Sequence, residues 1–209
     1  MERERITISI KKTVLDQIDG VIDGTKIRNR SHAVETLALK AIGEVDYNQA
    51  VILLGGDNAL KSIPAAKQYL LSLKDAGFTN VTIAVGFLAE KVKEKIGFGL
   101  EYDLSIQYND KGEGSGGALN TVRKDIKSSI LVINTDKKIS IDLKKFFEFH
   151  KKKSALMTVA TDSLDTYEGV YIIEPEALKQ LPKGFSMIED DLIPKLAKMQ
   201  ELIVFPVSD

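Results

Sequence analysis

Ala50-Val51-Ile52-Leu53-Leu54-Gly55-Gly56 is an unbroken run of apolar residues that ends in two glycines. A run of this kind, without alternation of polar residues, is typical of a strand buried on both faces of a parallel sheet. The two glycines predict a loop at the carboxyl end of this strand, where open α/β sheets bind their ligands. The run therefore indicates an α/β domain, expected over residues 48–209.

Helix and strand patterns alternate downstream of this run. Helices are expected at 65–76, 88–96, from 118 onward, at 143–152 and near 194–199, and strands at 81–85, 105–108, 130–134, near 157–161, near 169–173 and at 202–207. Residues 109–117 are expected to form a loop. Strands that alternate with helices predict a Rossmann-like, mostly parallel sheet with helices on both faces.

Three polar stretches follow predicted strands and should meet at one edge of this sheet: Gly55–Asn58, Gly112–Gly117 and Asn134–Asp136. Backbone N–H groups in such turns favour a nucleotide's base or phosphate. The predicted ligand-binding residues are Gly55, Gly56, Asp57, Asn58, Gly114, Ser115, Gly116, Asp136 and Lys137. The glycines are equally compatible with plain turns. The run Glu189-Asp190-Asp191 is better explained as an acidic first helical turn than as a metal cluster.

A separate domain is expected over residues 1–45. Ile6, Ile8 and Ile10 alternate with polar residues, which is the period of a strand with one buried face. A lone strand is marginal in water, and no second strand follows, so the expected partner is the same strand of a second copy. The alternative is an edge strand of the following domain. Two helices should follow, the first opened by a capping box at Thr13 and the second capped by Ser31.

RITISI and RNRSHAVETLALKAI, separated by an amphipathic helix, resemble the ribbon-helix-helix DNA-binding family of the Arc and MetJ class. The resemblance implies an intertwined dimer, or a tetramer built from it, that binds the major groove of double-stranded DNA. It implies that outward strand residues read bases and that the second helix N-terminus grips a phosphate. The predicted DNA-binding residues are Arg3, Arg5, Thr7, Ser9, Arg28, Arg30, Ser31 and His32.

Residues 49–207 are similar to the sugar-phosphate nucleotidyltransferases, which join a sugar phosphate to a nucleoside triphosphate. The resemblance is carried by AVILLGG, LLSLKDAGFTNVTIAVGFLAEKVKEKIG, GSGGAL, LVINTDKKISIDLKKFFEFHKKKSALMTVA, GVYIIEPEALKQLPKG and MIEDDLIPKLAKMQELIVFPV. It implies that GSGGAL contacts the base and that Asp136 occupies the position of a metal-binding aspartate.

Departures from the family pattern predict that this domain is a pseudoenzyme. Only residues 57–64 separate Gly56 from the next helix, where the family has a long segment with an arginine and a lysine for the phosphates. The segment around 161–167 is also short, and a second metal-binding aspartate is missing. We therefore expect no catalytic residue and no metal, Asp136 being the one remaining candidate ligand.

Composition limits the function further. The 209 residues include 29 basic and 30 acidic side chains, and the net charge of −1 favours no class of partner. Residues 24–32, however, form a local basic patch without an acid, which favours DNA contact. There is no cysteine, which excludes disulfides. No apolar run reaches transmembrane length and no signal-peptide core is present, so we expect a cytoplasmic protein without membrane contact.

The leading hypothesis from the sequence is a DNA-binding transcription regulator. Its nucleotidyltransferase-like domain would sense an effector or oligomerise; no cofactor is assigned, and a nucleotide or nucleotide sugar is the candidate effector. One alternative is an active sugar-phosphate nucleotidyltransferase that carries a DNA-binding arm. Another is an antitoxin-like or architectural DNA binder whose large domain binds a protein partner.

Overall fold

The computed structural model describes residues 5–24, 27–42, 49–56, 58–136, 140–161 and 169–207. The chain divides into two compact units, Met1–Asp46 and Tyr47–Asp209. Within the described ranges, no helix has both the length and the apolar character needed to cross a membrane.

The smaller unit contains two helices, α1 (Lys12–Asp19) and α2 (Arg30–Ile42). Helix α1 begins without a side-chain cap, so the capping box expected at Thr13 is not formed. Helix α2 is capped by Asn29, whose side-chain oxygen accepts a hydrogen bond from the His32 N–H at 3.0 Å. The prediction that Ser31 caps this helix is therefore wrong, because Asn29 occupies the N-cap position three residues before that N–H.

The strand expected near the N-terminus is not formed within this single chain. Residues 5–11 lie outside any helix or strand, and Arg3 falls outside the described residues. The side chains of Ile6 and Ile8 are 72% and 53% exposed. A strand requires a neighbour for its backbone hydrogen bonds, and the described residues of this chain supply none at this segment. The structure therefore shows two helices but not the ribbon-helix-helix arm.

The larger unit is built on one sheet of seven strands in the order β3-β2-β1-β4-β6-β5-β7. The strands are β1 (Gln49–Leu53), β2 (Asn80–Ala84), β3 (Ser105–Asn109), β4 (Ile130–Asn134), β5 (Met157–Thr161), β6 (Val170–Ile173) and β7 (Leu202–Pro206). All neighbours pair in parallel except at β6, which runs antiparallel to both β4 and β5. The predicted mostly parallel α/β sheet is confirmed.

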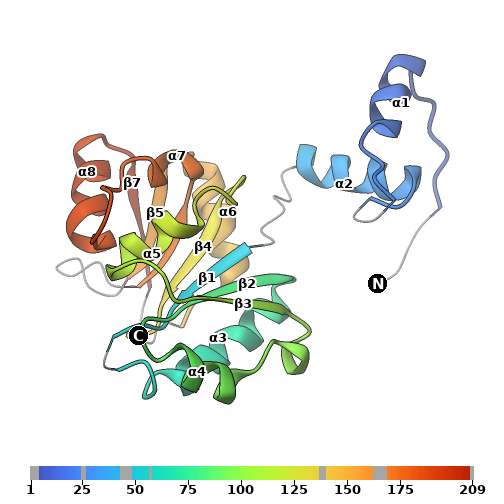
Figure 1. Cartoon of the computed structure of the whole chain (residues 1–209). Helices are drawn as coiled ribbons and strands as arrows, with labels where there is room; N and C mark the ends of the chain where they lie inside the picture. The colour runs from blue at the N-terminus through green and yellow to red at the C-terminus, as the bar shows by residue number, and fades with distance from the viewer. Residues whose placement is uncertain are drawn as a thin grey trace. The chain divides into compact units, whose positions relative to one another are not determined.

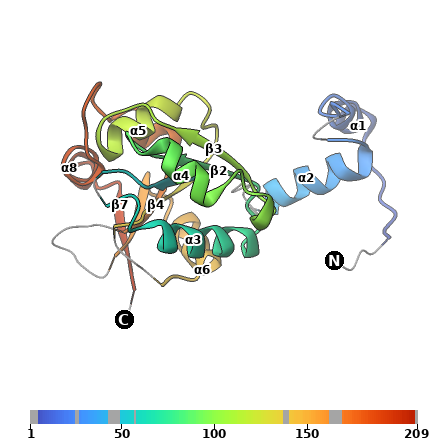
Figure 2. The same cartoon turned by 60° about the horizontal axis from the view of Figure 1, so that its bottom comes forward.

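Helices cover both faces of this sheet, as Figures 1 and 2 show. One face packs against α3 (Ile63–Asp75), α4 (Ala89–Ile96) and α6 (Leu143–Lys153), and the other against α5 (Gly114–Val122), α7 (Pro175–Leu178) and α8 (Ile193–Lys198). Strand β1 explains the two layers, since Ala50 and Ile52 enter the first core while Val51 and Leu53 enter the second. Both faces of β1 are thus apolar, which is why its sequence does not alternate.

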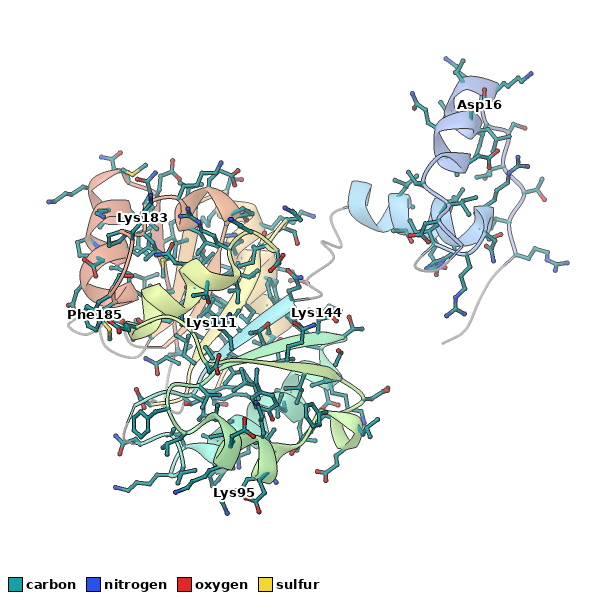
Figure 3. The ribbon with its side chains drawn as sticks, in the orientation of Figure 1. Asp16, Lys95, Lys111, Lys144, Lys183 and Phe185 are labelled. Atoms are coloured by element: carbon teal, nitrogen blue, oxygen red, sulfur yellow. The ribbon has the colours of Figure 1, made fainter. Side chains whose placement is uncertain are left out.

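Two short irregular turns complete the unit. The 3-10 turn η1 spans Leu100–Tyr102, and a π-helical turn, η2 (Ile188–Leu192), leads directly into α8. Charged side chains lie on the outer surfaces of the helices; Lys95 on α4, for example, is exposed and points away from the sheet (Figure 3). Helix α5 begins at Gly114, so the prediction of a loop through residue 117 is wrong.

Candidate functional site

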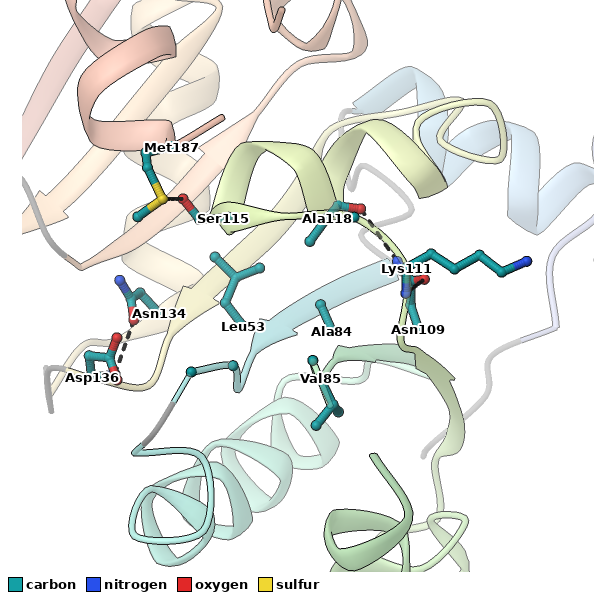
Figure 4. Close-up of a pocket in the computed structure, with 15 residues that line it drawn as sticks. Leu53, Ala84, Val85, Asn109, Lys111, Ser115, Ala118, Asn134, Asp136 and Met187 are labelled. Atoms are coloured by element: carbon teal, nitrogen blue, oxygen red, sulfur yellow. Dashed lines mark hydrogen bonds between the residues drawn. The ribbon is translucent and has the colours of Figure 1, made fainter. Parts of the chain in front are cut away.

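The carboxyl ends of four adjacent strands, β1 to β4, border one pocket of about 320 Å³ (Figure 4). Its lining consists of small or apolar residues and a few polar ones. They are Leu53, Gly55, Gly56, Ala84, Val85, Gly86, Asn109, Lys111, Gly112, Gly114, Ser115, Ala118, Asn134, Asp136 and Met187. A concave site at this edge of an open α/β sheet is the usual place for a ligand.

The pocket brings together five of the residues predicted to bind a ligand: Gly55, Gly56, Gly114, Ser115 and Asp136. Gly116 is buried behind the lining, and Asn58 does not line the pocket. Asp57 and Lys137 lie outside the described residues. The binding roles of all nine stay predictions.

Several lining residues were missed by sequence reasoning. Asn109 ends β3 and Gly86 follows β2 closely, so the rule that ligands lie beyond strand ends, which had already singled out Asn134, would have identified them. Met187 comes from a distant segment and has no local signal. Its position depends on how the chain returns to the pocket after α7.

The glycine-rich start of α5 is fixed by contacts with Ser186. The carbonyl oxygen of Ser186 accepts hydrogen bonds from the N–H groups of Gly116 at 2.9 Å and Gly117 at 3.2 Å. Gly114 has a φ of +77°, and a Cβ atom at this position would lie 2.3 Å from the same oxygen. Only glycine fits there without a shift of the backbone.

The first two N–H groups of α5 remain available to a ligand. Those of Gly114 and Ser115 have no acceptor among the residues that the structure describes. They lie at the positive end of the helix dipole, which favours an acceptor atom or an anion.

The end of β4 is tied to the end of β1. The Thr135 hydroxyl donates to the Leu53 carbonyl oxygen at 2.8 Å, and the Asn134 side-chain oxygen accepts from the Asp136 N–H at 3.0 Å. The Asp136 side chain is exposed and borders the pocket. No described group of three or more His, Cys, Asp or Glu side chains is arranged to hold a metal ion.

Lys111 is the only cationic residue in the described lining of this pocket. Its backbone N–H donates to the Asn109 side-chain oxygen at 3.1 Å, and the Asn109 amide group donates to Thr121 Oγ1 and, at 3.4 Å, to the Ala118 carbonyl oxygen. Asn109 therefore joins the end of β3 to α5. In Figure 4 the Lys111 side chain extends away from Asp136.

The described residues predicted to contact DNA belong to the smaller unit. Arg5, Thr7 and Ser9 are exposed, and Ser31 and His32 lie in the first turn of α2. Arg30 donates from Nε and Nη2 to the two carboxylate oxygens of Asp19, both at 2.6 Å. This hydrogen bonding holds the pKa of Asp19 below its ordinary value.

The Asp19–Arg30 ion pair joins α1 to α2, so the guanidinium expected at a DNA phosphate is bound within the unit. Arg28 donates its backbone N–H to His32 Nδ1 at 3.4 Å. DNA binding by Arg3, Arg5, Thr7, Ser9, Arg28, Arg30, Ser31 and His32 stays a prediction.

Sequence comparison finds distant relatives. The chain is 28% identical over 139 residues to a D-glycero-alpha-D-manno-heptose 1-phosphate guanylyltransferase of Aneurinibacillus thermoaerophilus, which covers 57% of this chain and 60% of the relative. It is 22% identical over 182 residues to a UTP–glucose-1-phosphate uridylyltransferase of a Synechocystis strain, covering 64% and 47%. The chain thus spans about half the length of these curated relatives. No family model matches it.

Structural comparison identifies the same fold. A crystal structure from Bacillus anthracis, assigned as a glucose-1-phosphate thymidylyltransferase, superposes with a TM-score of 0.64 at 18% identity. The match covers 77% of this chain and 87% of that one.

These relatives overturn the leading hypothesis from the sequence. Their names are those of enzymes, so the predictions of a transcription regulator and of a pseudoenzyme are wrong. The regulator prediction rested on the ribbon-helix-helix resemblance of the N-terminal residues. The pseudoenzyme prediction rested on short connections at residues 57–64 and 161–167 and on a missing second metal-binding aspartate. Loop length varies freely among proteins that share a sheet, and it is therefore weak ground for denying activity. The larger unit has the α/β fold of the sugar-phosphate nucleotidyltransferases.

Proposed function

We propose that the larger unit is a nucleotidyltransferase that acts on a nucleoside triphosphate and a sugar phosphate. A phosphate oxygen of the sugar phosphate would attack the α-phosphorus of the triphosphate. The bond from this phosphorus to the bridging oxygen would break, and pyrophosphate would leave with the electron pair. The observation that carries the proposal is the pocket itself, where a glycine-rich helix start and Asp136 border one cavity in this fold.

The lining divides into parts suited to a nucleotide. Leu53, Ala84 and Val85 offer apolar contact to a flat base. The N–H groups of Gly114 and Ser115 offer donors to an acceptor atom of the nucleotide. Lys111 lines the same cavity, and its exposed side chain would have to turn toward the ligand to offset phosphate charge.

Asp136 suits a divalent cation such as Mg²⁺. Its carboxylate is exposed at the pocket and has no hydrogen-bond partner among the described residues. One carboxylate is sufficient, since Mg²⁺ commonly binds one or two carboxylates together with substrate phosphates and water. When bound, the ion would neutralise charge on the phosphates during transfer.

The test is turnover by the full chain. GTP, UTP or dTTP would be combined with glucose 1-phosphate or mannose 1-phosphate and Mg²⁺, and pyrophosphate and nucleotide sugar would be measured. We expect both products in equal amounts, and a loss of at least about 100-fold in Asp136→Asn. Asp75→Asn, at an exposed position in α3, is the matched control and should retain activity. The absence of products and of nucleotide binding by the wild type would overturn the proposal.

We also propose that the smaller unit associates with a second copy of itself. Within residues 5–38, the buried hydrophobic side chains are Ile18 and Ala33, while Ile6, Ile8, Val14 and Val21 are exposed. A second copy would cover these exposed aliphatic side chains, and a unit of this size buries little surface when it folds alone.

Sedimentation equilibrium tests this association. We expect a dimer for the wild type, a monomer for Ile8→Asp and a dimer for the matched control Thr7→Asp, whose side chain alternates to the other side of the segment. A monomeric wild type would contradict it. Binding of double-stranded DNA by the dimer stays a prediction.

A further inference from the structure

Ser115 has a hydroxyl whose hydrogen bonds can be assigned. It lies in the first turn of α5 and lines the pocket. Its Oγ accepts a hydrogen bond from the Ile188 N–H at 2.8 Å. The Ser115 hydroxyl can donate its proton to Glu189 Oε2 at 3.2 Å or to Met187 Sδ at 4.0 Å. Figure 4 shows the contact with Met187. A hydroxyl has one proton, and a carboxylate is a much stronger acceptor than a thioether, so the proton points to Glu189.

Glu189 is itself held in place. Its second oxygen, Oε1, accepts a hydrogen bond from the Tyr171 hydroxyl at 2.7 Å. Tyr171 is fully buried in β6, and its hydroxyl oxygen accepts from the Gly169 N–H at 3.2 Å. Both carboxylate oxygens therefore have partners, and one of those partners belongs to the rigid sheet.

The π-helical turn brings this carboxylate back to α5. Glu189 is the second residue of η2, and the N–H that precedes the turn, on Met187, donates to Asp191 Oδ2 at 2.8 Å. Turns with π geometry occur often at functional sites, because the additional residue redirects a side chain. Here Glu189 connects the core of the sheet to the pocket lining.

We propose that Glu189 is a positioning residue that restricts Ser115 to one hydrogen-bonding role. The hydroxyl proton is directed to Glu189 and one lone pair is taken by Ile188, so the remaining lone pair is all that Ser115 offers a ligand. At this point the pocket takes a group that donates a hydrogen, such as a ring N–H, an amino group or a sugar hydroxyl. Together with the N–H donors of Gly114 and Ser115, it recognises a ligand edge that carries a donor beside an acceptor.

The substitution Glu189→Gln tests this role because it turns Ser115 from a hydrogen-bond acceptor for the ligand into a donor. The glutamine oxygen still accepts from Tyr171, but its NH₂ group then faces Ser115 Oγ and donates to it. With both lone pairs occupied, the hydroxyl offers its proton to the ligand instead. Asp190→Asn is the matched control, since it makes the same charge change at an exposed neighbour.

Calorimetry on the full chain measures the effect, with GTP, UTP and dTTP as probes. For the nucleotide that the wild type binds, we expect Glu189→Gln to raise Kd about tenfold, and Asp190→Asn to leave it unchanged. Removal of a negative charge would by itself favour an anionic nucleotide, so a weaker affinity cannot come from net charge.

A double-mutant cycle separates positioning from a general structural role. In a Ser115→Ala background, Glu189→Gln should change Kd by less than about twofold, because the inverted hydroxyl is absent. An equal loss of affinity in both backgrounds, or no loss in the Ser115 background, would overturn the proposal.

This inference rests on the proposed function, and a ligand-free measurement distinguishes their failures. Glu189→Ala should accelerate amide hydrogen exchange in residues 113–117 and at Ile188 at least about fivefold, whereas Asp190→Ala should not. Faster exchange with no nucleotide binding by the wild type would reject the proposed function and retain the positioning role. Unchanged exchange would reject the positioning role.

Discussion

His150 Nε2 lies 2.9 Å from Glu174 Oε1 in a polar cluster on the sheet edge opposite the pocket. The same carboxylate oxygen accepts from the Ser129 hydroxyl at 2.6 Å, and His150 Nδ1 lies 2.7 Å from Thr158 Oγ1. His150 is 3% exposed and the cluster links α6 to three strands or their ends. Burial by itself raises the pKa of Glu174, but the hydrogen bonds from His150 and Ser129, together with the charge of His150, outweigh it and lower the pKa.

This cluster should make stability depend on acid pH. A carboxylate with a lowered folded-state pKa stabilises the fold above its unfolded-state pKa, and this contribution is lost as the pH falls through the folded value. We expect the wild-type free energy of unfolding, from urea titrations, to fall below about pH 4.5, and less steeply in Glu174→Gln. At pH 7 this variant should lose about 1–2 kcal/mol. Glu176→Gln, exposed on α7, should behave like the wild type.

Glycines in the pocket should differ sharply in their tolerance of alanine. At Gly114 a Cβ would lie 2.3 Å from the Ser186 carbonyl oxygen and the φ is +77°. We expect Gly114→Ala to lower the free energy of unfolding by about 2–4 kcal/mol. At Gly55 a Cβ would have no atom within 4 Å, so Gly55→Ala should change the free energy of unfolding by less than about 0.5 kcal/mol. Equal thermal unfolding of the two variants would contradict the described geometry.

Asn109 should contribute to stability through its amide group. Asn109→Ala leaves the Ala118 carbonyl oxygen and the Lys111 N–H without this partner, and we expect a loss of about 1–2 kcal/mol in chemical denaturation. Gln107→Ala is the control on the same strand, where the side chain is exposed and has no hydrogen-bond partner among the described residues. A loss as large at Gln107 would show that strand propensity, rather than the amide contacts, sets the effect.

The Asp19–Arg30 pair should order the smaller unit. Asp19→Asn and Arg30→Met should each accelerate amide exchange in residues 30–36, and the double variant should be no worse than either single one. The difference from the wild type should shrink at about 1 M NaCl, because salt screens exposed charges. Arg28→Met is the control. Additive effects of the two single variants would mean that the pair does not couple the helices.

The sequence predicts the strands well because their signal is local. The stretches at 130–134 and 157–161, rich in β-branched and aliphatic residues, are buried along nearly their whole length, and the structure contains strands at both. The direction of β6 is not predictable in this way, since an apolar run is the same whichever way it points.

The start of α5 and the lining by Met187 depend on tertiary contacts. Gly114-Ser115-Gly116-Gly117 has poor helix propensity, and it forms a helical turn because Ser186 accepts two of its N–H groups. No local pattern shows that residues 186–189 return to this place. The pseudoenzyme prediction was wrong for a related reason, because short loops were taken as evidence of missing chemistry.

The strand order has a consequence for synthesis on the ribosome. Strand β4 lies between β1 and β6, and β5 pairs with β6 and β7 rather than with β4. A nascent chain that ends before Val170 therefore has Ile130, Leu131, Val132 and Ile133 in place but one side of their strand unpaired. Unpaired apolar edges recruit other chains. The protein must keep this edge apart from its neighbours on the polysome until β6 leaves the exit tunnel and inserts.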